Sequence, residues 1–381
     1  MARWALVNEA AGELQNSVEV EGELTSGVKT PFQEDAVMPG INPRPTLKPR
    51  SSGALNRAVL LLAHGTPATV EDIPEYLRNV VSGRPMPQQV VEEIQHRYSL
   101  IGSPPGHSPL TELTLEQGAL LEAEIGEKVY VGMRNWRPYI GDVVKQMRAD
   151  AVEEAAVICL APQNSRTSVG LYRRAALAEA GGMRMDFLEG WAGEPLLAEA
   201  FAERLRVAHR RLSEETGAPA PVIFTAHSVP LRTVQPEASA AEVGGERIHW
   251  PTANPAAAGS PDPYADEARL TARLVAESVP EIPAWRFAFQ SQGASGGAWI
   301  GPTVEETLDG LAAEGVKAVV LQPIGFLCDH VEILYDVDIA FKGYAEKVGI
   351  RLERPESLND SPLLTRALAK LARESFARLD G

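Results

Sequence analysis

The chain has 381 residues, enough for two or three domains of ordinary size. Hydrophobic residues make up 44% of it and charged residues 23%, a composition typical of globular proteins. Apolar runs such as 58–63 and 318–321 are far shorter than the roughly 20 residues of a membrane-spanning helix, so no transmembrane segment is expected. The net charge of −15, from 36 basic and 51 acidic residues, argues against a nucleic-acid partner.

The two cysteines, Cys159 and Cys328, are too few for a disulfide framework or a four-thiolate iron–sulfur cluster, so neither is expected. Residues 1–56 hold five prolines between Pro31 and Pro49 and few aromatic residues, which predicts a disordered tail. Its first residues lack the apolar core of a secretory signal, and we expect a cytoplasmic protein.

From Arg57 onward, short apolar runs rich in β-branched residues alternate with amphipathic stretches, a pattern typical of parallel α/β proteins. Strands are expected at 58–63, 129–131, 156–160, 183–188, 222–225, 286–289, 318–321 and 350–352. Helices are expected between them, at 87–98, 110–124, 195–215, 265–277, 304–314 and 362–379.

An internal repeat connects two parts of the chain. The run V-L-L-L-A-H-G-T-P holds His64 and the run V-I-F-T-A-H-S-V-P holds His227, 163 residues later. Two further strand ends, V-I-C-L-A-P and V-V-L-Q-P, place Pro162 and Pro323 at almost the same offset, 161 residues. We therefore predict two similar Rossmann-like halves, 57–216 and 217–381, each a parallel sheet flanked by helices, with the last helix free to pack back on the first half. Ligands bind beyond the carboxyl ends of such strands, so the active-site cleft is expected between the halves.

His227 directly follows an expected strand, so its imidazole is predicted to project from the carboxyl edge of a sheet. An imidazole that titrates near neutrality can accept a proton or bind a metal ion. The alternative is a structural histidine that is hydrogen-bonded to a loop. The position at a strand end and within the repeat favours the functional interpretation.

The densest group of ionisable residues lies in F-L-C-D-H-V-E-I-L-Y-D-V-D, at Asp329, His330, Glu332, Asp336 and Asp338. If the segment is helical from His330 onward, Glu332 and Asp336 share one face, where two like charges cost about 0.2–0.5 kcal/mol. A solvated acidic face is the alternative, and it fits the interleaved apolar residues poorly. A structural zinc site requires four closed ligands, so the pattern instead predicts an open, transient site of oxygen and nitrogen ligands.

Other segments give weaker signals. The glycine-rich stretches 101–109 and 290–302 lack a phosphate-loop motif, so a nucleotide is not expected. Trp299 offers a flat apolar face in the second stretch. An anionic substrate would need arginines, for which the candidates are Arg84, Arg134, Arg137, Arg166, Arg173 and Arg174.

From about residue 57 to 379 the chain resembles the ferrochelatases, which insert ferrous iron into a porphyrin. The resemblance rests on T-A-H-S-V-P, D-P-Y, F-Q-S-Q-G…W-I-G-P and P-I-G-F-L-C-D-H-V-E-I-L-Y-D-V-D. It implies two Rossmann-like halves with the porphyrin between them. It also implies that His227 and Glu332 are the catalytic and metal-binding residues, with His330 and Asp336 supporting them along the route of the ion.

The resemblance further implies porphyrin contacts, which we assign to His64, Arg84, Ser228 and Trp299. The segment S-G-R-P-M-P-Q-Q-V-V-E-E-I-Q-H-R-Y is similar to the branch that acts on coproporphyrin III, which we favour over protoporphyrin IX. Two positions depart from the family pattern: His64 stands where that branch often has an aromatic residue, and Ala340 stands where the acidic series usually continues. An insertion at 232–260 has no assigned role.

The implied reaction removes two pyrrole protons while Fe²⁺ sheds its water and binds the ring nitrogens. It needs no organic cofactor, and none is expected. We expect His227 to accept a proton and Glu332 to act as an iron ligand or proton relay, in a monomeric protein. Two alternatives stay open at this point. One is a haem-binding or haem-delivery protein without turnover, in which His64 ligates haem iron. The other is a chelatase for sirohydrochlorin or cobalt with the same fold.

Overall fold

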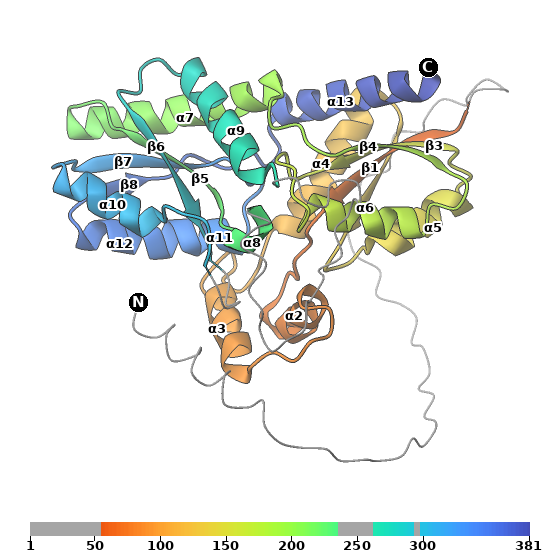
Figure 1. Ribbon diagram of the computed structural model, residues 1–381, viewed down its shortest axis with the longest axis horizontal. Helices are drawn as coiled ribbons and strands as arrows, with labels where there is room; N and C mark the ends of the chain where they lie inside the picture. Colours follow the sequence, from red (N-terminus) through yellow and green to blue (C-terminus); the bar gives the residue numbers. More distant parts are fainter. Residues whose placement is uncertain (1–54, 235–261, 293–297) are drawn as a thin grey trace, which may run out of the picture. The chain divides into compact units, whose positions relative to one another are not determined.

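The computed structural model describes residues 55–234, 262–292 and 298–381 (Figure 1). Most of the expected tail, most of the insertion at 232–260 and part of the stretch 290–302 lie outside the described residues. Among the described residues, no helix combines the length and the apolar character that crossing a membrane requires.

Two four-stranded sheets form the framework, and each is parallel throughout. The first has the order β2-β1-β3-β4 and the second the order β6-β5-β7-β8, so the two have the same topology. Their strands are β1 (Arg57–Ala63), β2 (Lys128–Met133), β3 (Glu154–Cys159), β4 (Arg184–Leu188), β5 (Val222–His227), β6 (Trp285–Gln290), β7 (Ala318–Pro323) and β8 (Arg351–Glu353). This confirms the predicted pair of similar halves and all eight expected strands.

Helices cover both faces of each sheet (Figure 1). In β1, Val59 and Leu61 belong to one apolar layer while Leu60 and Leu62 belong to the layer on the opposite face. Because strands of this kind are buried on both faces, they read in the sequence as continuous apolar runs. The helices of the first half are α2 (Ile73–Val80), α3 (Gln88–Ser99), α4 (Leu110–Ile125), α5 (Ile140–Ala149) and α6 (Val169–Ala178).

The second half repeats this arrangement. Its further helices are α8 (Leu231–Val234), α9 (Tyr264–Ser278), α10 (Val304–Ala313), α11 (Val331–Leu334), the π-helical segment η4 (Asp336–Phe341) and α12 (Lys342–Lys347). Side chains of α10, α11, η4 and α12 pack on one face of the second sheet, and α9 contributes to the layer on the other. The segment after His330 is therefore not one continuous α-helix.

The last helices of the two halves are exchanged. Helix α7 (Pro195–Thr216), which lies before the predicted boundary at 216, packs against β7 and β8 of the second sheet. Helix α13 (Pro362–Asp380), at the end of the chain, packs against β3 and β4 of the first. Ser375 of α13 donates a hydrogen bond of 2.6 Å to Asp186 on β4, and Arg378 pairs with the same carboxylate at 2.8 Å. This exchange ties the halves together through one shared apolar layer.

Helices α2 and α3 form a smaller apolar cluster beside the first sheet. Its buried members include Tyr76, Tyr98 and Trp136, and the partly buried Val331 and Leu334 of α11 pack against it. The segment of the first half that contains α2 and α3 thus contacts α11, the short helix of the second half on which Glu332 lies.

Gly65, directly after β1, adopts a left-handed φ of +76°, and an added Cβ would lie 2.6 Å from the Met133 Cβ. Gly126 at the end of α4 has φ +72° but nothing within 4 Å of an added Cβ. Both Gly65→Ala and Gly126→Ala incur left-handed strain of about 1–2 kcal/mol, and only Gly65→Ala adds a steric clash. We expect urea unfolding to show the larger loss of stability for Gly65→Ala. Equal losses would contradict this account.

Candidate active site

Two histidines stand at equivalent carboxyl edges of the two sheets. His227 is the last residue of β5, and His64 directly follows β1. Strand β5 runs two residues further than the sequence predicts because Ala226 and His227 pair with β6. His64 interacts electrostatically with Glu332, His330 and His227, so groups from both halves gather at one place.

Three of these side chains form a row. Glu332 Oε1 lies 3.3 Å from His227 Nε2, and its Oε2 lies 3.4 Å from His330 Nε2. The Nδ1 atom of His227 is hydrogen-bonded to the Ser228 carbonyl, and that of His330 to the Cys328 carbonyl at 3.0 Å. Because a carbonyl only accepts, both Nδ1 atoms carry their hydrogen, and both Nε2 atoms face the carboxylate.

The row is electrostatically coupled. Burial opposes the charged form of each group, but the two histidines hold the pKa of Glu332 well below its usual range. Burial likewise lowers the pKa of His227, yet the Glu332 charge and the bonds to Glu332 and Ser228 raise it overall. The side chains of His227 and Glu332 remain 30% and 32% exposed, so a substrate can reach both. The carboxylate is a ready ligand, and the imidazole can retain a proton at Nε2.

Asp336 lies next to this row and is nearly buried. Its Oδ2 accepts a hydrogen bond from Ser291, and its Oδ1 lies 3.6 Å from the Arg97 guanidinium. Burial and the Glu332 charge raise the pKa of Asp336, although Ser291 and Arg97 oppose the shift. Ser291 adopts φ +61°, a strained conformation that persists only where the surroundings hold it. The π-helical segment begins at Asp336, and such segments are frequent at functional sites.

The ionisable residues of the segment 326–338 form two separate groups in the structure, whereas the sequence predicts a single group. His330, Glu332 and Asp336 gather near His227, whereas Asp329 and Asp338 bind Arg354. Asp338 makes bonds of 2.9 and 2.7 Å to that guanidinium, whose side chain is only 12% exposed. Asp329 and Asp338 therefore belong to a charge-paired network and not to the group around His227.

His64 is held by two side chains that the sequence did not single out. The Tyr76 hydroxyl lies 2.9 Å from Nε2, and the Asn135 amide donates to the ring at 3.2 to 3.3 Å. A hydrogen bond from this ring to the Gly65–Pro67 loop would be the alternative structural role of His64. Within the described residues, the ring makes no such bond. Desolvation lowers the pKa of His64 to about 4, opposed by the Glu332 charge and supported by His330, His227 and Arg134. The residue is also exposed to solvent, and water offsets part of that desolvation. The positive charges of the neighbouring groups still act to lower the pKa of His64.

The other expected porphyrin contacts lie in different environments. The Trp299 ring is 6.5 Å from the His227 ring between centroids. Ser228 is fully buried, and its hydroxyl donates to the Ile300 carbonyl at 2.8 Å, so it fastens the segment that holds Trp299. Arg84 lies in the exposed turn between α2 and α3, where its Nε donates to the Val81 carbonyl at 2.9 Å.

Two residues that sequence reasoning missed hold the backbone of the row. Tyr264 donates from its hydroxyl to the His227 carbonyl at 3.0 Å. Gln290 donates from its amide to the Glu332 carbonyl at 3.0 Å, while its amide oxygen accepts from Thr225 at 2.6 Å. Both residues lie in the motifs D-P-Y and F-Q-S-Q-G, but nothing in the sequence states which carbonyl each would reach.

Arg134 carries a half-buried positive charge at the end of β2. Its guanidinium makes no hydrogen bond or ion pair with any residue in the part of the chain that the structure describes. Desolvation lowers its pKa, Tyr172 opposes this, and the neighbouring Arg174 adds to it. A desolvated cation beside a second one favours binding of an anion.

Within residues 55–234, 262–292 and 298–381, no three His, Cys, Asp or Glu side chains converge in a way that could hold a metal ion. His227 and Glu332 contribute two atoms of suitable chemistry, one nitrogen and one oxygen. The arrangement offers a base, a carboxylate ligand and an aromatic face within a few ångströms of each other.

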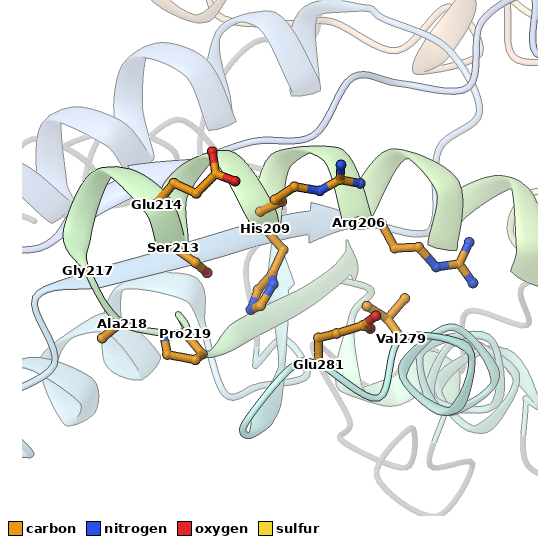
Figure 2. Close-up of a pocket in the computed structure, with 10 residues that line it drawn as sticks. Arg206, His209, Ser213, Glu214, Gly217, Ala218, Pro219, Val279 and Glu281 are labelled. Atoms are coloured by element: carbon orange, nitrogen blue, oxygen red, sulfur yellow. The ribbon is translucent and has the colours of Figure 1, made fainter.

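A pocket of about 460 Å³ lies at the amino ends of β5 and β6, on the opposite edge of the second sheet (Figure 2). Two of its polar side chains are already engaged: Arg206 pairs with Glu199 at 2.8 Å, and His209 donates to the Ala220 carbonyl at 3.0 Å. We assign it no role in the chemistry, because it holds none of the residues of the row.

Comparison with known proteins identifies the family of the chain. Residues 56–376 match the family model described as Ferrochelatase. A ferrochelatase of Acidobacterium capsulatum is 60% identical over 323 residues, covering 84% of this chain and 95% of that protein. A coproporphyrin III ferrochelatase of Bacillus subtilis is 31% identical over 331 residues, covering 84% of this chain and 98% of that protein.

A solved multi-domain protein of Deinococcus radiodurans, described as structurally similar to chelatases, has a TM-score of 0.50 at 12% identity. The alignment covers 85% of this chain and 56% of that one, and it concerns the fold alone. The family match covers most of the chain, and the alignment with the relative at 60% identity covers 84% of it. The chain therefore belongs to the ferrochelatase family.

Proposed function

We propose that this ferrochelatase of haem biosynthesis inserts Fe²⁺ into coproporphyrin III, with His227 and Glu332 as its catalytic residues. The observation that carries the proposal is the row of His227, Glu332 and His330, in which a base and a carboxylate, both partly exposed, lie 3.3 Å apart. Several relatives at 31% to 33% identity are named coproporphyrin III ferrochelatases. Coproporphyrin III has more carboxylate arms than protoporphyrin IX, which suits the unpaired charge of Arg134.

Each turnover exchanges two pyrrole N–H protons for one Fe²⁺ ion, so a proton acceptor and ligands that replace water are both required. His227 Nε2 accepts a proton from the ring, and the Glu332 charge stabilises the imidazolium that forms. Glu332 also offers an oxygen to the incoming ion, with His330 orienting the carboxylate and Asp336 adding negative charge beside it. Trp299 packs on the macrocycle next to His227.

The test compares substrates on the purified protein. Iron-dependent loss of porphyrin fluorescence is measured with coproporphyrin III, protoporphyrin IX and sirohydrochlorin. We expect the highest kcat/KM for coproporphyrin III. A higher value for protoporphyrin IX would contradict the proposed substrate, and iron insertion into sirohydrochlorin alone would support the other chelatase reaction.

His64 is proposed to contact the porphyrin and to bind iron on the opposite side from His227 once the metal is in the ring. A neutral imidazole is a suitable ligand, but it must first give up its bond to Tyr76. We expect His64→Phe to insert iron at a similar rate and to lose an axial nitrogen signal from the absorption and resonance Raman spectra of the product. Identical product spectra would leave His64 a structural residue and would also remove the support for a haem-delivery role.

The remaining assignments stay predictions from the sequence. They are the porphyrin contacts of Arg84 and Ser228, the domain limits 1–56, 57–216 and 217–381, the monomeric state, the cytoplasmic location, and the expected lack of an organic cofactor and of an iron–sulfur cluster.

A further inference from the structure

The segment between β8 and α13 contacts the backbone just before the His227 row. Asn359 directs two polar groups at this backbone: its N–H donates to the Leu327 carbonyl at 2.8 Å, and its amide oxygen accepts from the Asp329 N–H at 2.9 Å. Its amide nitrogen donates to Asp329 Oδ2 at 3.0 Å. Asn359 also adopts φ +44°, a conformation that asparagine tolerates better than most residues. A turn alone would need only a glycine here, whereas both ends of this amide are used.

Arg354, five residues earlier, holds the other side of the same region. Its guanidinium bonds to Asp338 at 2.9 and 2.7 Å and lies 3.3 Å from Asp329 Oδ1, which also accepts from Ser357 at 2.7 Å. Asp329 precedes α11 in the chain, and Asp338 lies beyond it in η4. Arg354, Ser357 and Asn359, which we call the 354–359 clamp, therefore fasten both ends of the helix that carries Glu332.

The clamp reaches the reacting groups through one further residue. His330 donates to the carbonyl of Cys328, which lies between the two residues that Asn359 binds, and its other nitrogen lies 3.4 Å from Glu332. Fixing 327–329 therefore fixes the ring that orients the carboxylate. From α4 of the first half, Gln117 Nε2 donates to the Asn359 carbonyl at 2.6 Å and lies 3.0 Å from Cys328 Sγ. The clamp thus also connects the first half to this loop.

We propose that the 354–359 clamp positions His330 and Glu332 for metal insertion, with Asn359 as its central positioning residue. The inference rests on the proposed roles of His330 and Glu332. It goes beyond them because the hydrogen bonds and ion pairs of the clamp in the described residues go to Asp329, Asp338 and the 327–329 backbone and not to the row itself. A displacement of about 1 Å in a catalytic group can cost up to a hundredfold in rate, so the effect should appear in kcat.

The test exchanges the donor and the acceptor of the hydrogen bond between Asn359 and Asp329. Asn359→Asp removes the donor and brings two carboxylates together, and we expect kcat for iron insertion to fall roughly ten- to a hundredfold. Adding Asp329→Asn restores a donor opposite the new carboxylate, so the double variant should regain most of the lost kcat. The porphyrin Kd, measured by fluorescence titration, should be the same in all of them.

Two more variants keep the result interpretable. Asn359→Gly retains the left-handed backbone without the amide and should also lose kcat, whereas Ala151→Gly, at a remote left-handed position with φ +56°, should keep it. Parent-like kcat in Asn359→Asp and Asn359→Gly, or no recovery in the double variant, would overturn the inference. If Glu332→Gln itself inserts iron normally, the proposed function fails, whatever the clamp variants show.

Discussion

We expect His227→Ala to lower kcat for iron insertion by roughly 10²- to 10⁴-fold, the usual cost of removing a general base. The reason is the place of its Nε2 atom, which faces Glu332 from the end of β5, in a side chain that remains partly exposed. The fold should survive, because His227 lies at the strand end and outside the apolar layers. Its loss leaves the Ser228 carbonyl without one hydrogen bond, a cost of about 0.5–1.5 kcal/mol.

The measurement is single-turnover iron insertion together with circular dichroism and the Tm of each variant. His107→Ala is the matched control, since His107 is a histidine paired with the exposed Glu112 at 3.2 Å and should leave kcat unchanged. A folded His227→Ala variant that turns over near the parent rate would remove His227 from the mechanism.

The fold could be predicted because its signals are local and repeated. Continuous apolar runs with β-branched residues mark strands buried on both faces, and the offset between His64 and His227 places them at equivalent edges of two equal sheets. The sequence left open that the last helix packs on the first half, but the reciprocal packing of α7 on the second sheet could not be predicted in the same way. Amphipathic helices show which face is apolar, but they do not show which of two similar sheets that face will cover.

The sequence predicts the chemical type of each site residue, but not the partner that each side chain contacts in the fold. The sequence predicts a dense group of ionisable residues in 326–338, and the resemblance assigns a role to Glu332 and none to Asp338. Neither shows that Asp338 is paired with Arg354, because this partner lies elsewhere in the chain. Asp338 is paired with Arg354, whereas Glu332 lies beside His227. Tyr76 and Asn135 were missed for a similar reason, since their contact with His64 spans 12 and 71 residues.

Glu332→Gln preserves the shape of the side chain and removes its charge, and we expect kcat for iron insertion to fall by roughly a hundredfold or more, with little change in porphyrin affinity. Single-turnover insertion and fluorescence titration of the porphyrin separate the two effects. Glu112→Gln, the same change beside the surface His107, is the matched control and should keep the parent kcat. A loss confined to porphyrin binding would contradict the role of Glu332 at the metal.

The same substitution has a second expected result that does not depend on catalysis. Without the Glu332 charge, burial dominates the environment of His227, so the pKa of its imidazole should fall, as NMR titration can measure. In the parent, the lowered pKa of Glu332 stabilises the fold above its ordinary value of 4.5, and this stability is lost as the pH falls through the folded value. The raised pKa of His227 stabilises the fold below its ordinary value of 6.5, and this stability is lost as the pH rises through the folded value. The parent should therefore exceed Glu332→Gln in free energy of unfolding, measured with urea, by the largest amount between pH 4.5 and pH 6.5. The difference should be smaller at a pH above the folded pKa of His227. An advantage that does not change across this range would mean that Glu332 and His227 are not coupled in the folded protein.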